Sequence, residues 1–86
     1  MSAKLLDLEV VHLDGEAWFQ FSWSGESWEW REALDALKAT VPYGARQFDP
    51  ESKVWRVRTD YEDALDGIFP NFAGALDAMR SQLSMF

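Results

Sequence analysis

The chain has no cysteine among its 86 residues, few prolines and glycines, and no long apolar run. The absence of cysteine excludes a disulfide framework, an iron–sulfur cluster, a thiolate zinc site and a cysteine nucleophile. No stretch approaches the roughly eighteen apolar residues of a membrane span. No basic segment followed by an apolar run marks a signal peptide. We therefore expect a cytoplasmic protein that has no membrane partner and holds its fold by packing alone.

Catalytic groups are scarce as well. The only histidine, His12, falls inside a predicted strand, and nothing nearby identifies a partner for general acid–base catalysis. No serine stands in a Gly-x-Ser-x-Gly elbow, and no glycine-rich loop is present to hold a phosphate. Glu62 and Asp66 have the spacing of one helix face, but no calcium-loop spacing surrounds them. The sequence therefore predicts a protein that is not an enzyme and carries no metal and no cofactor.

Aromatic residues are abundant and indicate a packed core. The chain holds five tryptophans, six phenylalanines and two tyrosines, and 48% of it is apolar. Because each aromatic side chain buries on the order of 150–250 Å², half of these residues suffice for the core of a small domain. We expect residues 1–86 to fold as a single domain, as suits this length.

The first forty residues predict a β-hairpin followed by a helix. Residues 5–13 and 16–23 alternate apolar and polar side chains, and Asp14-Gly15 between them is a strong hairpin signal. On the first strand the pattern places three residues on one face: Leu6, Leu8 and Val10. The helix has Ser24 or Ser27 as its N-cap and ends at Pro42. Its apolar face carries Trp30, Ala33, Leu34, Leu37 and Val41.

A second hairpin and two more helices are predicted for the rest of the chain. Residues 43–48 and 53–58 form its strands, and the Asp49-Pro50 turn places Phe48 opposite Lys53. Thr59 and Glu62 have capping-box spacing at the start of a short helix. Asn71 is a cap for the last helix, whose apolar face carries Phe72, Leu76, Met79 and Leu83.

These elements predict an α+β fold with the order ββα-ββα and an extra C-terminal helix. Two amphipathic hairpins and amphipathic helices are best buried as a four-stranded antiparallel sheet with the helices packed on one face. The hairpins fix only the local strand pairs, so the order of strands in the sheet stays open.

Basic residues are concentrated in the second hairpin. It holds four of the eight in the chain: Arg46, Lys53, Arg56 and Arg58. Strand alternation places Gln47, Arg56 and Arg58 on one face of this ribbon. Such a face can contact nucleic-acid phosphates, although the net charge of −7 opposes attraction at long range. Alternatively, these cations pair with the acidic helices or protect an exposed sheet edge.

The same hairpin resembles a known motif. Residues 45–57, preceded by Val41-Pro42-Tyr43 and followed by Asp60-Tyr61 and Ala64-Leu65, are similar to the hairpin of HARP domains. These occur on annealing-helicase proteins, and related small modules occur on primase-like or helicase-like proteins. The shared pattern is a strand ending in Arg-x-aromatic-Asp, a tight turn, then Lys-x-Trp and a strand leading into a helix.

This resemblance covers about residues 41–65 and implies contact with DNA structures. It implies nucleic-acid contacts for Arg46, Lys53 and Arg56, and core positions for Phe48 and Trp55. No motor domain accompanies the hairpin in these 86 residues. The resemblance therefore bears on the fold more than on the function.

Two tryptophans fit a buried position less well than the others. Trp18 shares its strand face with Gln20 and Ser22, and Trp28 points away from Trp30 on the helix. An exposed tryptophan is a typical anchor for a protein partner. Alternatively, the C-terminal helix or a self-associating surface covers these rings.

Two functions follow from these observations. The first is a small non-enzymatic accessory module in DNA or RNA transactions, which binds single strands or junctions through Arg46, Lys53, Arg56 and Arg58. The second is an acidic adaptor or inhibitor that binds a protein partner through Trp18, Trp28 and the acidic helices.

Overall fold

Two β-hairpins supply the strands of the sheet. The computed structural model describes residues 3–83, and within it the first hairpin pairs β1 (Lys4–Leu13) with β2 (Glu16–Ser24). Asp14 and Gly15 between them have φ of 52° and 80°, the left-handed pair that a type I′ turn requires. The second hairpin pairs β3 (Arg46–Asp49) with β4 (Val54–Arg58). Both predicted hairpins are thus confirmed.

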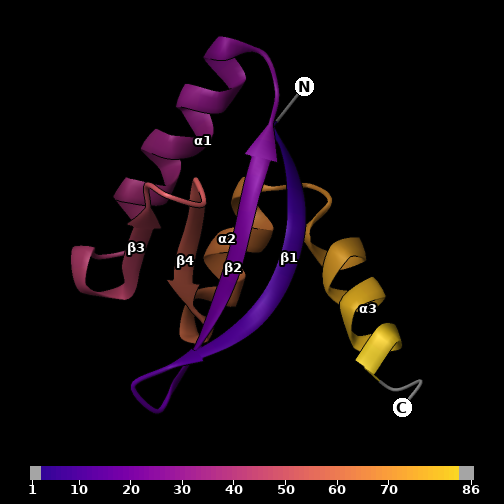
Figure 1. Cartoon of the computed structure of the whole chain (residues 1–86). Helices are drawn as coiled ribbons and strands as arrows, with labels where there is room; N and C mark the ends of the chain where they lie inside the picture. The colour runs from indigo at the N-terminus through magenta and orange to yellow at the C-terminus, as the bar shows by residue number, and fades with distance from the viewer. Residues whose placement is uncertain (1–2, 84–86) are drawn as a thin grey trace.

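The hairpins join into one antiparallel sheet of order β1-β2-β4-β3 (Figure 1). The junction pairs β2 with β4, where Phe19 lies opposite Val57 and Phe21 opposite Trp55. Three helices complete the α+β fold: α1 (Ser27–Thr40), α2 (Glu62–Ile68) and α3 (Phe72–Leu83). They contribute buried residues to a single core on one face of the sheet, as predicted.

The core consists of the inward residues of the strands and the apolar faces of the helices. Phe19 packs edge-on against Phe72 of α3, with ring centroids 5.5 Å apart, and Phe21 packs against Phe69 at 5.7 Å. These inward phenylalanines follow the alternation predicted for β2. The largest completely buried side chains are Phe21, Phe69, Phe72, Leu37, Leu65, Val41 and Val57.

A bulge in β1 changes which residues of that strand face the core. Asp7 has φ of 55°, and the register with β2 shifts between Leu6 and Glu9. Leu5 is therefore buried, at 3% exposure, whereas Leu6 is 37% exposed. The predicted inward position of Leu6 is wrong, because an extra residue in a strand reverses the alternation beyond it.

The helix starts also differ from the predictions. The N-cap of α1 is Glu26, whose side chain and backbone form a reciprocal capping box with Glu29, so neither Ser24 nor Ser27 has this role. Residues 59–61 form a 3₁₀ turn, η2 (Thr59–Tyr61), and α2 begins at Glu62 without a side-chain cap. The predicted capping box of Thr59 and Glu62 is therefore absent. No helix in the described part of the chain is long and apolar enough to cross a membrane.

Asn71 stands directly before α3, but its side chain serves β1. Its Oδ1 accepts a hydrogen bond from the Leu5 backbone N–H, and its Nδ2 donates to the Leu5 carbonyl, both at 3.0 Å. Only the backbone carbonyl of Asn71 joins α3, accepting from the Ala75 N–H at 3.0 Å. Asn71 thus satisfies two outward backbone groups of an edge strand, which would otherwise be open to pairing with another chain. The apolar face predicted for α3 is buried at Phe72 and Leu76, whereas the Leu83 side chain lies outside the described part.

Candidate functional site

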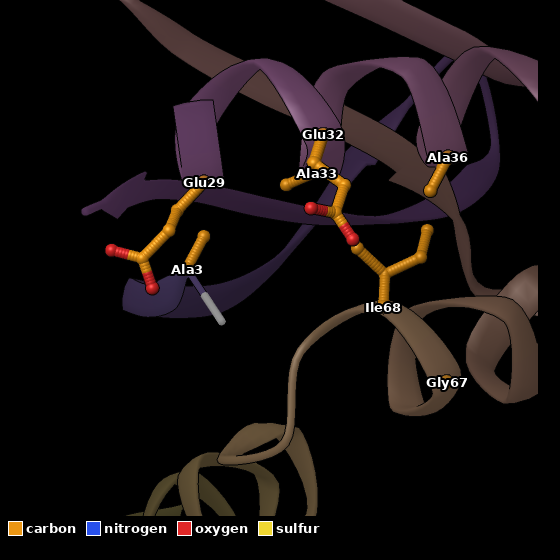
Figure 2. A pocket seen from close by; sticks show the side chains of 7 residues that line it. All are labelled: Ala3, Glu29, Glu32, Ala33, Ala36, Gly67 and Ile68. Atoms are coloured by element: carbon orange, nitrogen blue, oxygen red, sulfur yellow. The ribbon is translucent and has the colours of Figure 1, made fainter. Parts of the chain in front are cut away.

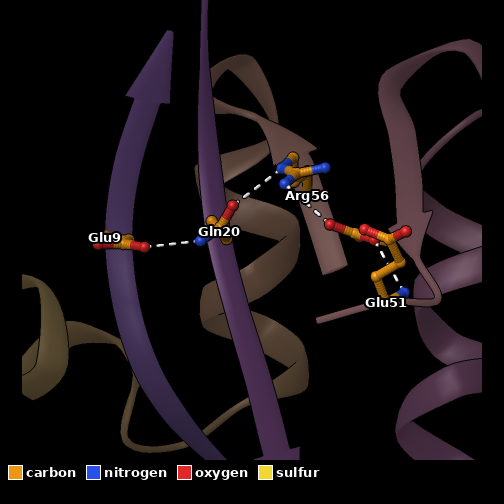
Figure 3. A network of polar contacts seen from close by, with 5 residues as sticks. Glu9, Gln20, Glu51 and Arg56 are labelled. Atoms are coloured by element: carbon orange, nitrogen blue, oxygen red, sulfur yellow. Dashed lines mark hydrogen bonds and ion pairs between the residues drawn. The ribbon is translucent and has the colours of Figure 1, made fainter. Parts of the chain in front are cut away.

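The sheet face away from the helices carries a chain of polar contacts across all four strands (Figure 3). Arg56 of β4 donates to the Gln20 side chain at 2.9 Å, and Gln20 donates to Glu9 of β1 at 2.6 Å. On its other side, Arg56 pairs with Asp49 of β3 at 3.4 Å. The guanidinium of Arg56 is thus held in place by neighbours from the sheet itself.

Arg58 is neutralised on the same face. It pairs with Glu16 at 3.1 Å and with Asp60 at 3.6 Å. The predicted sharing of one face by Gln47, Arg56 and Arg58 is confirmed, since Gln47 pairs with Arg56 in the sheet register. Yet each arginine has at least one carboxylate partner, so this face is not a continuous positive surface.

The turn of the second hairpin lies one residue later in the chain than predicted. The loop spans residues 50–53, with Lys53 at φ of 56° and its N–H donating to the Asp49 carbonyl at 2.7 Å. Phe48 therefore lies opposite Trp55, and the predicted pairing with Lys53 is wrong. The register differs by two residues, which leaves every side chain of the hairpin on the predicted face.

The ionised side chain of Asp49 stabilises this turn. Its side chain accepts the Glu51 N–H at 3.0 Å, and this bond, together with contacts from Ser52 and Arg56, lowers the pKa of Asp49 below its ordinary value. A carboxyl group whose pKa is lower in the folded than in the unfolded state adds to the free energy of unfolding above about pH 4. That contribution is lost as the pH falls through the pKa of the folded state. We expect wild type to unfold with a higher free energy than Asp49→Asn at pH 7, and the difference to shrink below about pH 4. Urea titrations of both proteins from pH 7 to pH 2 measure it, and a difference that stays constant would contradict this role.

Trp18 is buried, although its face of the sheet has no helix over it. It is only 5% exposed, and the guanidinium of Arg58 lies 6.0 Å from its ring centroid. Its cross-strand neighbours are Val11 and Arg58. The expectation that the Trp18 ring is exposed to a partner is therefore wrong, because the ring is buried.

Trp28 is exposed, as predicted. It is 58% exposed, in the first turn of α1. This ring is the most exposed of the tryptophans and belongs to neither of the hollows described below.

Four aromatic rings form a row from the second hairpin to α1. Phe48 contacts Trp55 with ring centroids 5.0 Å apart, Trp55 stacks on Trp23 at 6.0 Å, and Trp23 contacts Trp30 at 5.2 Å. Trp23 in the middle is buried, but Phe48 and Trp30 at the two ends are 47% and 39% exposed. The expected core positions of Phe48 and Trp30 are thus only half correct, because each ring packs on one side and faces solvent on the other.

Two neighbouring hollows flank Phe48 and share Phe48 and Trp55 as walls. We call them the turn-side hollow and the helix-end hollow, and together the aromatic groove. The turn-side hollow is completed by Ser22, Trp23, Trp30, Pro50 and Lys53. The helix-end hollow is completed by Lys38 of α1, Tyr43 and Gly44 of the 3₁₀ turn η1 (Tyr43–Ala45), and Arg46 and Gln47.

The charges of the aromatic groove are all positive. Lys38, Arg46 and Lys53 line it, and no aspartate or glutamate does, in a chain with fifteen acids. None of these three cations forms an ion pair within residues 3–83. Arg46 donates to the Val41 carbonyl at 3.0 Å and lies 5.8 Å from the ring centroid of Tyr43, which is 85% exposed.

The four predicted basic residues therefore separate into two pairs. Arg46 and Lys53 line the aromatic groove, whereas Arg56 and Arg58 lie on the open face in ion pairs. Lys38 and Tyr43 also belong to the site, although the sequence did not identify them. Tyr43 could have been identified from its place directly after Pro42, which ends the helix and begins an irregular turn. Lys38 could not have been identified, because a lysine on the polar side of a helix is ordinary.

Another hollow lies between α1 and the end of α2 (Figure 2). Two carboxylates line it, Glu29 and Glu32, together with alanines and Ile68. Glu29 is buried, at 7% exposure, but its carboxylate is already used by the capping box of α1. No group of three residues of the kinds that bind metals occurs in the described part of the chain, and the capping box explains why Glu29 is buried.

Comparisons with protein-family models, with curated proteins and with solved structures give no match. The resemblance to HARP domains therefore stays a prediction from the sequence, and the candidate site stands on its geometry.

Proposed function

We propose that this protein is a small non-enzymatic accessory module in DNA or RNA transactions, and that it contacts nucleic acid through the aromatic groove of its second hairpin. The observation that carries this proposal is the segregation of charge. Three cations that have no carboxylate partner within residues 3–83 gather around exposed aromatic rings, while acids line neither hollow. Cations for phosphates and aromatic faces for bases are the combination that single-stranded nucleic acid binds.

The proposed contact surface is the aromatic groove and not the open face of the sheet. Arg56 and Arg58 are occupied by Asp49, Glu16 and Asp60, and a phosphate would have to displace these carboxylates. Lys38 and Lys53 are exposed and need no such exchange. The strong negative charge of the rest of the chain then limits affinity and suits a module that works beside a stronger binder.

A fluorescence-anisotropy titration of labelled single-stranded and forked DNA tests this function. With at most three phosphates neutralised, log affinity should fall against log salt with a slope of about −2, which is roughly a 15- to 20-fold loss from 50 to 200 mM salt. Lys38→Gln with Lys53→Gln should weaken binding by about 10- to 30-fold at 0.1 M salt and reduce the slope to about −0.7.

The matched control is Lys4→Gln with Arg80→Gln, which lowers the net charge by the same amount outside the groove. It should change affinity by less than about three-fold, since only long-range attraction is altered. Equal losses in both double variants would mean that charge acts without a local site. No binding at 20 mM salt would rule out the proposed function.

A second candidate is an acidic adaptor that binds a protein partner through Trp28. The observation in its favour is the 58% exposure of this ring in the first turn of α1, beside acidic residues of the same helix. Large exposed tryptophans are frequent anchors of protein interfaces. In the titrations above, Trp28→Ala should leave nucleic-acid affinity unchanged, so the two candidates are separable.

A further inference from the structure

The geometry of the aromatic groove points to a mode of binding, and this inference rests on the proposed function. We infer that the groove takes two consecutive nucleotides of a single strand, with one base in each of the two hollows that meet at Phe48. The two hollows meet at this ring and share it as a wall. A continuous chain that fills both must therefore pass over Phe48.

Phe48 is built as a fixed platform. It stands on the short edge strand β3, with 47% of its surface open, and Trp55 backs it at 5.0 Å. Trp55 is in turn supported by the buried Trp23 at 6.0 Å. A ring that is held from behind and open in front loses little freedom when a base stacks on it, so the stacking energy is retained as affinity.

Each hollow also offers what one nucleotide needs, a ring for its base and a cation for its phosphate. The helix-end hollow has Tyr43, which is 85% exposed, with Arg46 beside its ring and Lys38 at its rim. The turn-side hollow has Trp30, at 39% exposure, with Lys53. The three cations of the linings repel cationic ligands such as methylated lysine, which aromatic cages bind by cation–π attraction.

A double helix does not suit this surface. The faces of its bases are covered by their stacked neighbours, so aromatic rings reach them only after the strands separate. Rings and cations make up most of the lining of the groove, and Ser22 and Gln47 are its uncharged polar side chains. We expect preference for single strands with little dependence on sequence.

The experiment uses the 86-residue chain and three labelled probes: a ten-nucleotide oligothymidylate, the same oligomer with abasic units, and a ten-base-pair blunt duplex. The thymine oligomer should bind about 10-fold or more tighter than the abasic oligomer, which has the same phosphates and no bases to stack. It should also bind tighter than the duplex. This comparison needs no variant and is independent of folding.

The variants then locate the stacking. Phe48→Ala should weaken binding of the thymine oligomer by about 5- to 100-fold and leave the abasic oligomer nearly unchanged. Phe48→Trp should restore the affinity. Trp28→Ala should have no effect, because Trp28 is an aromatic residue more exposed than Phe48 that lies outside both hollows.

The outcomes distinguish a failure of the two-nucleotide mode from a failure of the proposed function. Salt-sensitive binding that is equal for thymine and abasic oligomers and indifferent to Phe48→Ala would overturn the two-nucleotide mode and leave an electrostatic accessory module. Tighter binding of the duplex would overturn the mode as well. No binding of any probe at 20 mM salt would overturn both.

Discussion

Replacing Phe21 by alanine is expected to lower the free energy of unfolding by about 3–5 kcal/mol. The side chain is completely buried in the centre of β2, with Phe69 at 5.7 Å and Trp23 at 6.0 Å from its ring centroid. Truncation removes contacts from both neighbours and leaves a cavity that the sheet on one side and the helices on the other are unable to close.

A chain of this length has a total stability of about 4–13 kcal/mol, so the variant loses a large fraction of it. Urea denaturation followed by circular dichroism measures the change. Phe48→Ala is the matched control, because it removes the same ring from a half-exposed position and should cost less than about 2 kcal/mol. Similar losses for the two variants would contradict the central position of Phe21.

Replacing Asn71 by leucine is expected to cost about 2–4 kcal/mol and to open the edge of the sheet. Leucine is close in size to asparagine, but it leaves both the N–H and the carbonyl of Leu5 without their partners. These groups are partly buried, so water replaces the lost bonds poorly. The exposed edge should also promote self-association at high concentration.

Urea denaturation, amide hydrogen exchange at Leu5 and sedimentation measure these effects. Asn71→Asp is the informative control, because its carboxylate still accepts from the Leu5 N–H but repels the Leu5 carbonyl. It should fall between wild type and Asn71→Leu in stability. A leucine variant that is as stable as wild type, with unchanged exchange at Leu5, would show that the side chain of Asn71 is dispensable for the edge.

The fold was largely predictable because local patterns and global packing agree. Alternation on β2 and the Asp14-Gly15 turn identify the first hairpin, and the inward Phe19 and Phe21 are buried as expected. The bulge at Asp7 was not predictable, since Leu5, Leu6 and Leu8 offer leucine to either face. The role of Asn71 depends on a partner 66 residues away, which no local pattern encodes.

The candidate site was predictable only in part. The sequence identified the hairpin and its four basic residues. Because these residues are close together in the sequence, it did not show that two of them lie on the open face and two in the aromatic groove. Arg56 and Arg58 pair with carboxylates placed beside them by the sheet. Arg46 instead shares a hollow with Lys38 of α1, and Lys53 shares one with Trp30 of α1. Whether a basic residue has a carboxylate partner depends on neighbours that are distant in the sequence, so it is decided only in the folded protein.

The strand order has a consequence for how the chain folds. Each hairpin closes a short loop, at little cost in chain entropy. The β2–β4 pair that joins them must close a loop that contains all of α1 and β3. Such a closure has to occur before its contacts repay the lost entropy. We therefore expect the pairing of Phe21 with Trp55 to belong to the slow step of folding, and the two hairpins to form faster.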